Sequence, residues 1–209
     1  MIYFMYKKSI VIDFDNTIGY FTQIIYILNI IEKTYKININ QKDINVLLKN
    51  YPNIFRPKII EILNLINILK NKEKIKFFIM YTCNNKEHFV KMIINYICNN
   101  LLINPNIFDF VVFQKKKEVK NIDTLKKFTD NKINNHILCF IDNKKYNYTN
   151  NNIYYIKCDS YIYTYTIQEI INNFPFDDFK KINSNLIKKY FNFINKKKST
   201  KNNIPLKIY

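Results

Sequence analysis

Short apolar runs alternate with amphipathic segments along most of this chain. Five runs are predicted to form buried strands because they are short and rich in β-branched or aromatic residues: 9–14, 75–81, 108–113, 137–141 and 153–156. Apolar residues recur at helical spacing in the segments 21–35, 41–50, 57–69, 86–99, 121–128, 166–173 and 179–194. This alternation predicts an α/β fold, a three-layer sandwich with a central parallel sheet covered on both faces.

Composition restricts the class of protein. With 209 residues and 48% hydrophobic content, the chain is long and apolar enough to form a core. Alanine and tryptophan are absent, Gly19 is the only glycine and Arg56 the only arginine, a bias that indicates an AT-rich genome. The net charge of +17 therefore reflects codon usage as well as any partner, and it predicts weak affinity for nucleic acid.

The domain organisation is expected to be simple. Residues 1–178 are predicted to form one domain with a small helical insertion at about 36–57, followed by a C-terminal helix and basic tail at 179–209. The four cysteines lack C-x-x-C pairing, and the two histidines do not form a ligand set, so we expect reduced thiols and no zinc site. No signal-peptide or membrane-spanning pattern is found, so we expect a soluble intracellular protein without a membrane partner.

Two aspartates follow the first predicted strand. Asp13 and Asp15 are one residue apart, and Thr17 comes two residues later. Alternate side chains of a strand share a face, so both carboxylates could point to one place beyond its end. Two carboxylates together in a cleft raise a pKa or require a cation, and Mg²⁺ is the usual oxygen-ligated ion. The alternative is an acidic turn in which these residues cap the next helix.

Other predicted strands also end in groups suited to phosphate or metal. The second strand ends at Thr82 and the fourth at Asp142-Asn143, while the lysine-rich segment 115–120 leads into the helix between strands three and four. Because the carboxyl ends of parallel strands share one edge, we expect these groups to meet there. Together they supply the parts needed for phosphoryl transfer. The alternatives are a helix cap at Thr82 and a simple turn at Asp142-Asn143.

The order of these groups resembles the four motifs of the haloacid dehalogenase (HAD) superfamily of phosphatases. The D-x-D-x-T segment 13–17 and the pair Arg56-Pro57 are similar to the branch that contains the phosphatases of the RNA polymerase II C-terminal domain. Further segments resemble uncharacterised homologues in large DNA viruses and some protists: 16–21, 78–82, 139–143, and 153–156 with Tyr161. The resemblance covers about residues 9–175 and implies a HAD-like Rossmannoid fold with a small or absent cap.

The resemblance also implies roles for individual residues. Asp13 would be the nucleophile that forms an aspartyl-phosphate, and Asp15 the general acid and base. Thr82 and Lys120 would hold the phosphate. The implied metal ligands are Asp13, Asp15 through its backbone carbonyl, and Asp142, with Mg²⁺ as the cofactor. Thr17, Asn143 and Arg56 would be accessory residues.

The implied activity is Mg²⁺-dependent hydrolysis of a phosphomonoester, with a phosphorylated protein (a Ser/Thr phosphatase substrate) as the expected partner. The alternatives are a nucleotide or polynucleotide-end phosphatase, and a catalytically degenerate HAD-fold module that binds a polyanion or protein. Two departures from the family pattern bear on this expectation. The last motif reads Asp-Asn instead of Asp-Asp, and Gln114 with nearby lysines stands where the viral relatives often have an arginine. A viral source would place the protein in the host cytoplasm or nucleus.

Overall fold

The predicted sheet is present, and all of its strands are parallel. In the computed structural model, which describes residues 7–102, 104–114, 120–146 and 152–173, the strand order is β3-β2-β1-β4-β5. The strands are β1 (Lys7–Ile12), β2 (Phe77–Thr82), β3 (Phe110–Phe113), β4 (His136–Asp142) and β5 (Ile153–Lys157). The α/β class predicted from the sequence is therefore confirmed, and β1 lies at the centre of the sheet.

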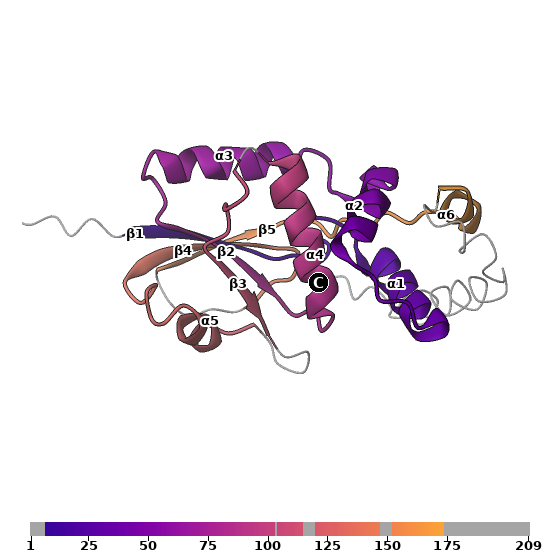
Figure 1. Ribbon diagram of the computed structural model, residues 1–209. Helices are drawn as coiled ribbons and strands as arrows, with labels where there is room; N and C mark the ends of the chain where they lie inside the picture. Colours follow the sequence, from indigo (N-terminus) through magenta and orange to yellow (C-terminus); the bar gives the residue numbers. More distant parts are fainter. Residues whose placement is uncertain (1–6, 103, 115–119, 147–151, 174–209) are drawn as a thin grey trace, which may run out of the picture. The chain divides into compact units, whose positions relative to one another are not determined.

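Helices cover both faces of this sheet. The α-helices between residues 22 and 128 are α1 (Thr22–Tyr35), α2 (Gln41–Asn50), α3 (Ile59–Asn71), α4 (Glu87–Tyr96) and α5 (Ile122–Phe128). Figure 1 shows α3 and α4 on one face and α5 on the other, which gives three layers. The same view shows α1 and α2 toward the end of the sheet where the strands finish. The HAD character of the fold and the size of any cap stay predictions.

Contacts divide the chain into two units, residues 1–164 and 165–209. The first contains the sheet and the five helices above, and the second contributes α6 (Ile167–Asn173). The predicted helix at 179–194 and the predicted domain boundary at 178 lie outside the described residues. Within those residues, none of the helices has the length and apolar character needed to cross a bilayer.

The alternation of side chains along the strands positions the polar groups that follow them. On the face that α5 covers, the apolar cluster includes Val11 of β1, Phe140 of β4 and Leu125 of α5. Asp13 and Asp142 come two residues after Val11 and Phe140, so the pleat directs them toward the same side of the sheet. The apolar core thus ends in two carboxyl groups beside the start of α5.

The loop after β1 is locked to the segment before α3. Gly19 forms isolated bridges with Asp15 and Phe55, and a Cβ at Gly19 would lie 2.5 Å from the Ile54 carbonyl oxygen. Asn16 adopts the left-handed region with φ 63°. The only glycine of the chain therefore permits a close approach between two backbones that any side chain would prevent.

Several predicted boundaries differ from the structure. β1 ends at Ile12, because Asp13 to Thr17 turn into the loop, and the helix predicted at 86–99 is α4 followed by a π-helical turn at Ile97–Leu101. The helical segment predicted from residue 57 starts two residues later, since α3 begins at Ile59 after a left-handed Lys58 (φ 63°). Pro57 instead belongs to the turn that separates Arg56 from the helix.

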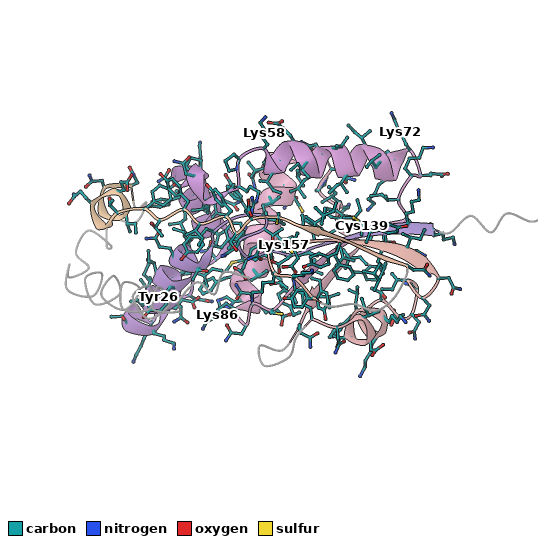
Figure 2. The ribbon with its side chains drawn as sticks, turned by 180° about the vertical axis from the view of Figure 1, so that it is seen from behind. Tyr26, Lys58, Lys72, Lys86, Cys139 and Lys157 are labelled. Atoms are coloured by element: carbon teal, nitrogen blue, oxygen red, sulfur yellow. The ribbon has the colours of Figure 1, made fainter. Side chains whose placement is uncertain are left out.

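Most lysines lie on the surface, as solvation of an ammonium group requires. Figure 2 labels exposed examples at the two ends of α3, Lys58 and Lys72, and at the end of β5, Lys157. Lys120 is different. It is 3% exposed and is the one buried lysine among the residues that the structure describes. A buried ammonium needs carboxylate partners, so we expect carboxylates at the sheet edge around Lys120.

Candidate active site

A buried cluster of three charged groups lies at the carboxyl ends of β1 and β4. The Lys120 Nζ atom contacts Asp13 Oδ1 and lies 2.8 Å from Asp142 Oδ2. Asp142 Oδ1 accepts a hydrogen bond from the Lys144 backbone N–H at 2.8 Å. The structure thus brings Lys120, which the resemblance singled out among several neighbouring lysines, into direct contact with both predicted carboxylates.

Thr17 fixes the second oxygen of Asp13. Its hydroxyl donates to Asp13 Oδ2 at 3.0 Å and accepts from the Asn143 backbone N–H at 3.2 Å. The backbone N–H of Asp13 donates to the Ile141 carbonyl at 2.9 Å, which continues the ladder between β1 and β4 by one residue. Both carboxylate oxygens and the backbone of Asp13 are therefore held, so the orientation of this carboxyl group is set before any ligand binds.

Asp15 lies in a different environment from Asp13. Its Oδ2 accepts a hydrogen bond from Asn84 Nδ2 at 2.9 Å, whereas its Oδ1 is buried and has no hydrogen-bond partner among the described residues. Burial raises the pKa of Asp15 to about 6, the hydrogen bond from Asn84 opposes this, and the charge of Asp13 adds to it. A carboxyl group with a pKa near neutrality can both give and take a proton.

Burial also raises the pKa of Asp13, although the Lys120 ammonium opposes this shift and Asp142 adds to it. For Lys120, burial lowers the pKa, but the charges of Asp13 and Asp142 outweigh burial and leave the pKa raised. We therefore describe Lys120 as an ammonium ion in this cluster. With all groups ionised, three carboxylates face one buried ammonium, and the excess negative charge favours a cation.

Thr82 reaches the carboxylates through Asn84. Thr82 is fully buried, and its Oγ1 accepts a hydrogen bond from the Asn84 backbone N–H at 3.1 Å, which turns the chain beyond β2. The Asn84 side chain then reaches Asp15, and its Oδ1 accepts from the Lys86 N–H at 2.9 Å just before α4. Asn84 was missed from the sequence, where its position two residues after Thr82 at a strand end was the available signal.

Arg56 ties together two loops without touching the carboxylates. Its guanidinium donates to the carbonyl oxygens of Thr17 (2.6 Å), Asn16 (2.7 Å) and Asp159 (2.5 Å), and it lies 5.5 Å from the centre of the Tyr161 ring. The backbone N–H of Arg56 donates to the Ile18 carbonyl at 2.9 Å. The only arginine therefore holds the loop after β1, which carries Asp15 and Thr17, against the loop after β5.

The residues present fit a divalent cation, although not as a cluster of carboxylates. Among the described residues, no three His, Cys, Asp or Glu side chains are grouped so as to hold a metal. One atom of the Asn143 amide, however, lies 3.3 Å from Asp13 Oδ2 and 3.2 Å from the Asp15 carbonyl oxygen, while the other lies 2.8 Å from Ser160 Oγ. In the absence of a cation, the amide nitrogen must face the two acceptors.

With Mg²⁺ bound, the amide oxygen of Asn143 can take that position instead. Asp13, the Asp15 carbonyl oxygen and the Asn143 amide would then together supply oxygen ligands of the kind that Mg²⁺ prefers. The carboxylate of Asp142 is already engaged by Lys120 and the Lys144 N–H. Its role as a metal ligand stays a prediction, while the Asn143 amide lies within 3.3 Å of both Asp13 Oδ2 and the Asp15 carbonyl oxygen.

The structure thus gathers most of the residues predicted from the sequence. Asp13, Thr17, Lys120, Asp142 and Asn143 form one connected cluster, Asp15 and Thr82 are joined to each other through Asn84, and Arg56 supports the loop. Gln114, which stands where the viral relatives often have an arginine, is buried and contacts the Tyr81 hydroxyl. Comparison of the chain with family models, curated proteins and solved structures found no match.

Proposed function

We propose that this protein is a Mg²⁺-dependent phosphomonoester hydrolase that acts through an aspartyl-phosphate on Asp13. The observation that carries the proposal is the contrast between two neighbouring carboxyl groups. Asp13 is fixed by Lys120 and Thr17, whereas Asp15 has a raised pKa and one buried oxygen without a hydrogen-bond partner among the described residues. Two carboxyl groups that are protonated to different extents because their environments differ are suited to the roles of nucleophile and acid/base.

In the first step of the proposed reaction, a carboxylate oxygen of Asp13 attacks phosphorus. An O–P bond forms, the bond from phosphorus to the ester oxygen breaks, and Asp15 donates its proton to the departing oxygen. In the second step, Asp15 takes a proton from a water molecule that attacks the phosphorus of the aspartyl-phosphate. The bond between Asp13 and phosphorus breaks, phosphate leaves, and both carboxyl groups return to their starting states.

Other residues of the cluster would bind and orient the phosphoryl group. The Lys120 ammonium neutralises charge on Asp13 and on the transferring group, while Thr17 keeps Asp13 in one orientation. Asp13, the Asp15 carbonyl and the Asn143 amide would hold Mg²⁺, with Asp142 as a further predicted ligand. When bound, the ion stabilises negative charge on the phosphoryl oxygens.

The class of substrate is a separate question from the chemistry of the reaction. A phosphorylated protein is favoured by the resemblance to the polymerase phosphatases alone. Nucleotides or 3′-phosphorylated oligonucleotides are the alternative, supported by the net charge of +17. Turnover of phosphopeptides, nucleotides and 3′-phosphorylated oligonucleotides under identical conditions separates the two classes.

The direct test is hydrolysis of p-nitrophenyl phosphate by purified wild type and by Asp13→Asn, with Mg²⁺ and with EDTA. We expect turnover by the wild type that is lost with EDTA and lost in the variant. Asp109→Asn is a matched control, because Asp109 is also ion-paired, to Lys70 at 2.8 Å, but immediately precedes β3, at the amino end of that strand. Undiminished turnover by Asp13→Asn would refute the mechanism. Absence of turnover by folded wild type would favour a binding module instead.

A further inference from the structure

The backbone next to Lys120 is held by a tyrosine from the core of the sheet. Tyr81, in β2, is fully buried, and its hydroxyl accepts a hydrogen bond from the Asn121 backbone N–H at 3.2 Å. The same hydroxyl contacts Gln114 Oε1 and lies 3.1 Å from the Asn121 carbonyl oxygen. One phenol group therefore touches both the backbone N–H and the carbonyl oxygen of the residue that follows Lys120.

This contact acts on the position of the Lys120 ammonium. A lysine has a long flexible stem, so the place of its ammonium is defined only when the backbone that carries it is fixed. Asn121 is also the N-cap of α5, where its Oδ1 accepts from the Thr124 N–H at 2.6 Å. The Tyr81 hydroxyl and the helix cap together fix the chain at Asn121, and the Tyr81 ring lies 5.5 Å from Lys120 Nζ.

Gln114 orients the hydroxyl. A phenol has a single proton to donate, so donation to Gln114 Oε1 leaves its lone pairs to accept the Asn121 N–H. Gln114 is 3% exposed, and its backbone N–H donates to the Thr82 carbonyl at 2.8 Å. The partner of the hydroxyl is thus itself fixed to the end of β2.

We propose that Tyr81 is a positioning residue that sets the place of Lys120 against Asp13, with Gln114 orienting the Tyr81 hydroxyl. In its catalytic consequences this inference rests on the proposed function. The competing explanation is that Tyr81 only fills the core, because its ring packs in the cluster with Leu125 and Phe140. Tyr81→Phe distinguishes the two, since it keeps the ring and removes only the hydroxyl.

The test is a double-mutant cycle in the hydrolysis of p-nitrophenyl phosphate with Mg²⁺. We expect Tyr81→Phe to lower kcat by about 10- to 100-fold with little change in KM, because the loss is one of orientation. Lys120→Met is expected to lower kcat by about 100- to 1000-fold. In the Lys120→Met background, Tyr81→Phe should cause little further loss, since the hydroxyl acts through Lys120.

Tyr96→Phe is the matched control, because Tyr96 is buried in α4 and stacks on Phe55, away from Lys120. Its kcat should remain near that of the wild type. An unchanged kcat in Tyr81→Phe, or a loss of the same size in both backgrounds, would overturn the positioning role and leave Tyr81 as a packing residue.

A second readout does not depend on activity. The bonded, buried ammonium of Lys120 exchanges its protons slowly, so we expect a ¹H–¹⁵N signal that disappears in Lys120→Met. Tyr81→Phe should broaden or remove this signal and accelerate exchange of the Asn121 amide, while Tyr96→Phe should do neither. If the wild type hydrolyses nothing, the proposed function fails but these spectra still decide the inference. An unaltered Lys120 signal in Tyr81→Phe would refute it.

Discussion

The buried polar groups at the amino end of the central strands are neutral, whereas those at the carboxyl end are charged. At the amino end, Ser9 Oγ and His136 Nδ1 form one hydrogen bond of 2.7 Å, and the His136 ring stacks on Phe77. Burial and the charges of Lys7 and Lys76 lower the pKa of His136, so the pair stays neutral near pH 7. At the carboxyl end, Asp13, Asp142 and Lys120 are buried as charged groups beside Asp15, whose Oδ1 has no hydrogen-bond partner in the part of the chain that the structure describes.

We infer from this difference that the pair at the amino end has a structural role and the charged cluster at the carboxyl end a functional one. A neutral hydrogen-bonded pair satisfies the demand of buried polar atoms at little cost. Buried charges cost free energy unless each is matched, and carboxylates outnumber ammonium groups at the carboxyl end. A protein retains such an arrangement where a ligand supplies the missing charge, which is the role that we propose for Mg²⁺.

The largest effect is expected for Lys120→Met. This change keeps the aliphatic stem but leaves Asp13 and Asp142 buried without their cation, so we expect a loss of about 3–5 kcal/mol in the free energy of unfolding. Urea unfolding without Mg²⁺ measures it. Saturating Mg²⁺ should restore part of the stability. A loss below about 1 kcal/mol would show that the buried ion cluster is not a central feature of this end.

Arg56→Lys should have the next largest effect. The variant keeps the positive charge but cannot reach the carbonyl oxygens of Asn16, Thr17 and Asp159 together, so we expect a loss of about 2 kcal/mol. Because the loop carries Asp15 and Thr17, kcat should also fall about 10-fold. If stability fell while kcat stayed constant, Arg56 would be an anchor of the fold alone.

Asp15 predicts a pH dependence of stability. The folded pKa of about 6 exceeds the ordinary value of 3.8, so the folded state binds more protons between these values. Protonated Asp15 therefore contributes to the free energy of unfolding. This contribution is complete below the ordinary pKa of 3.8 and is lost as pH rises through about 6. Without Mg²⁺, Asp15→Asn should therefore become more stable than wild type by about 1–2 kcal/mol at neutral pH, after allowance for its partial exposure. A constant difference across this range would contradict the raised pKa.

The smallest effect is expected at the amino end. Ser9→Ala removes the partner of His136 Nδ1 and should cost about 1 kcal/mol in unfolding free energy. Hydrolysis of p-nitrophenyl phosphate should stay within about twofold of the wild type, since no charged group of the cluster is altered. A marked loss of activity in this variant would break the division between the two ends of the sheet.

Much of this site could be predicted from the sequence because strand ends are visible as apolar runs that stop at polar residues. The pattern alone predicts that Asp13, Thr82 and Asp142 lie along one edge of the sheet. Lys120 could be chosen only through a family resemblance, because the segment 115–120 offers several lysines. Its contacts with Asp13 and Asp142 depend on the start of α5 lying on the same face as those residues.

Other contacts could not be predicted, because they join side chains through loops. The hydrogen bond from Asn84 to Asp15 joins the loop after β2 to the loop after β1. The hydrogen bond from the Asn121 N–H to the Tyr81 hydroxyl depends on how β2 is placed in the sheet relative to the start of α5. Gly19 and Arg56 stood out as single residues of their types. Only the close approach of Gly19 to Ile54 and the three carbonyl partners of Arg56 give the physical reasons for their places.

Trapping the phosphoenzyme would identify the nucleophile of the proposed reaction. Asp15→Asn should still be phosphorylated by p-nitrophenyl phosphate, whose leaving group needs little protonation, but it lacks the base that activates water. After an acid quench and borohydride reduction, mass spectrometry should find the modification on the peptide that contains Asp13. The Asp13→Asn protein should carry none. Phosphate on another residue, or turnover by the wild type with no phosphoenzyme in Asp15→Asn, would contradict the role of Asp13 as the nucleophile.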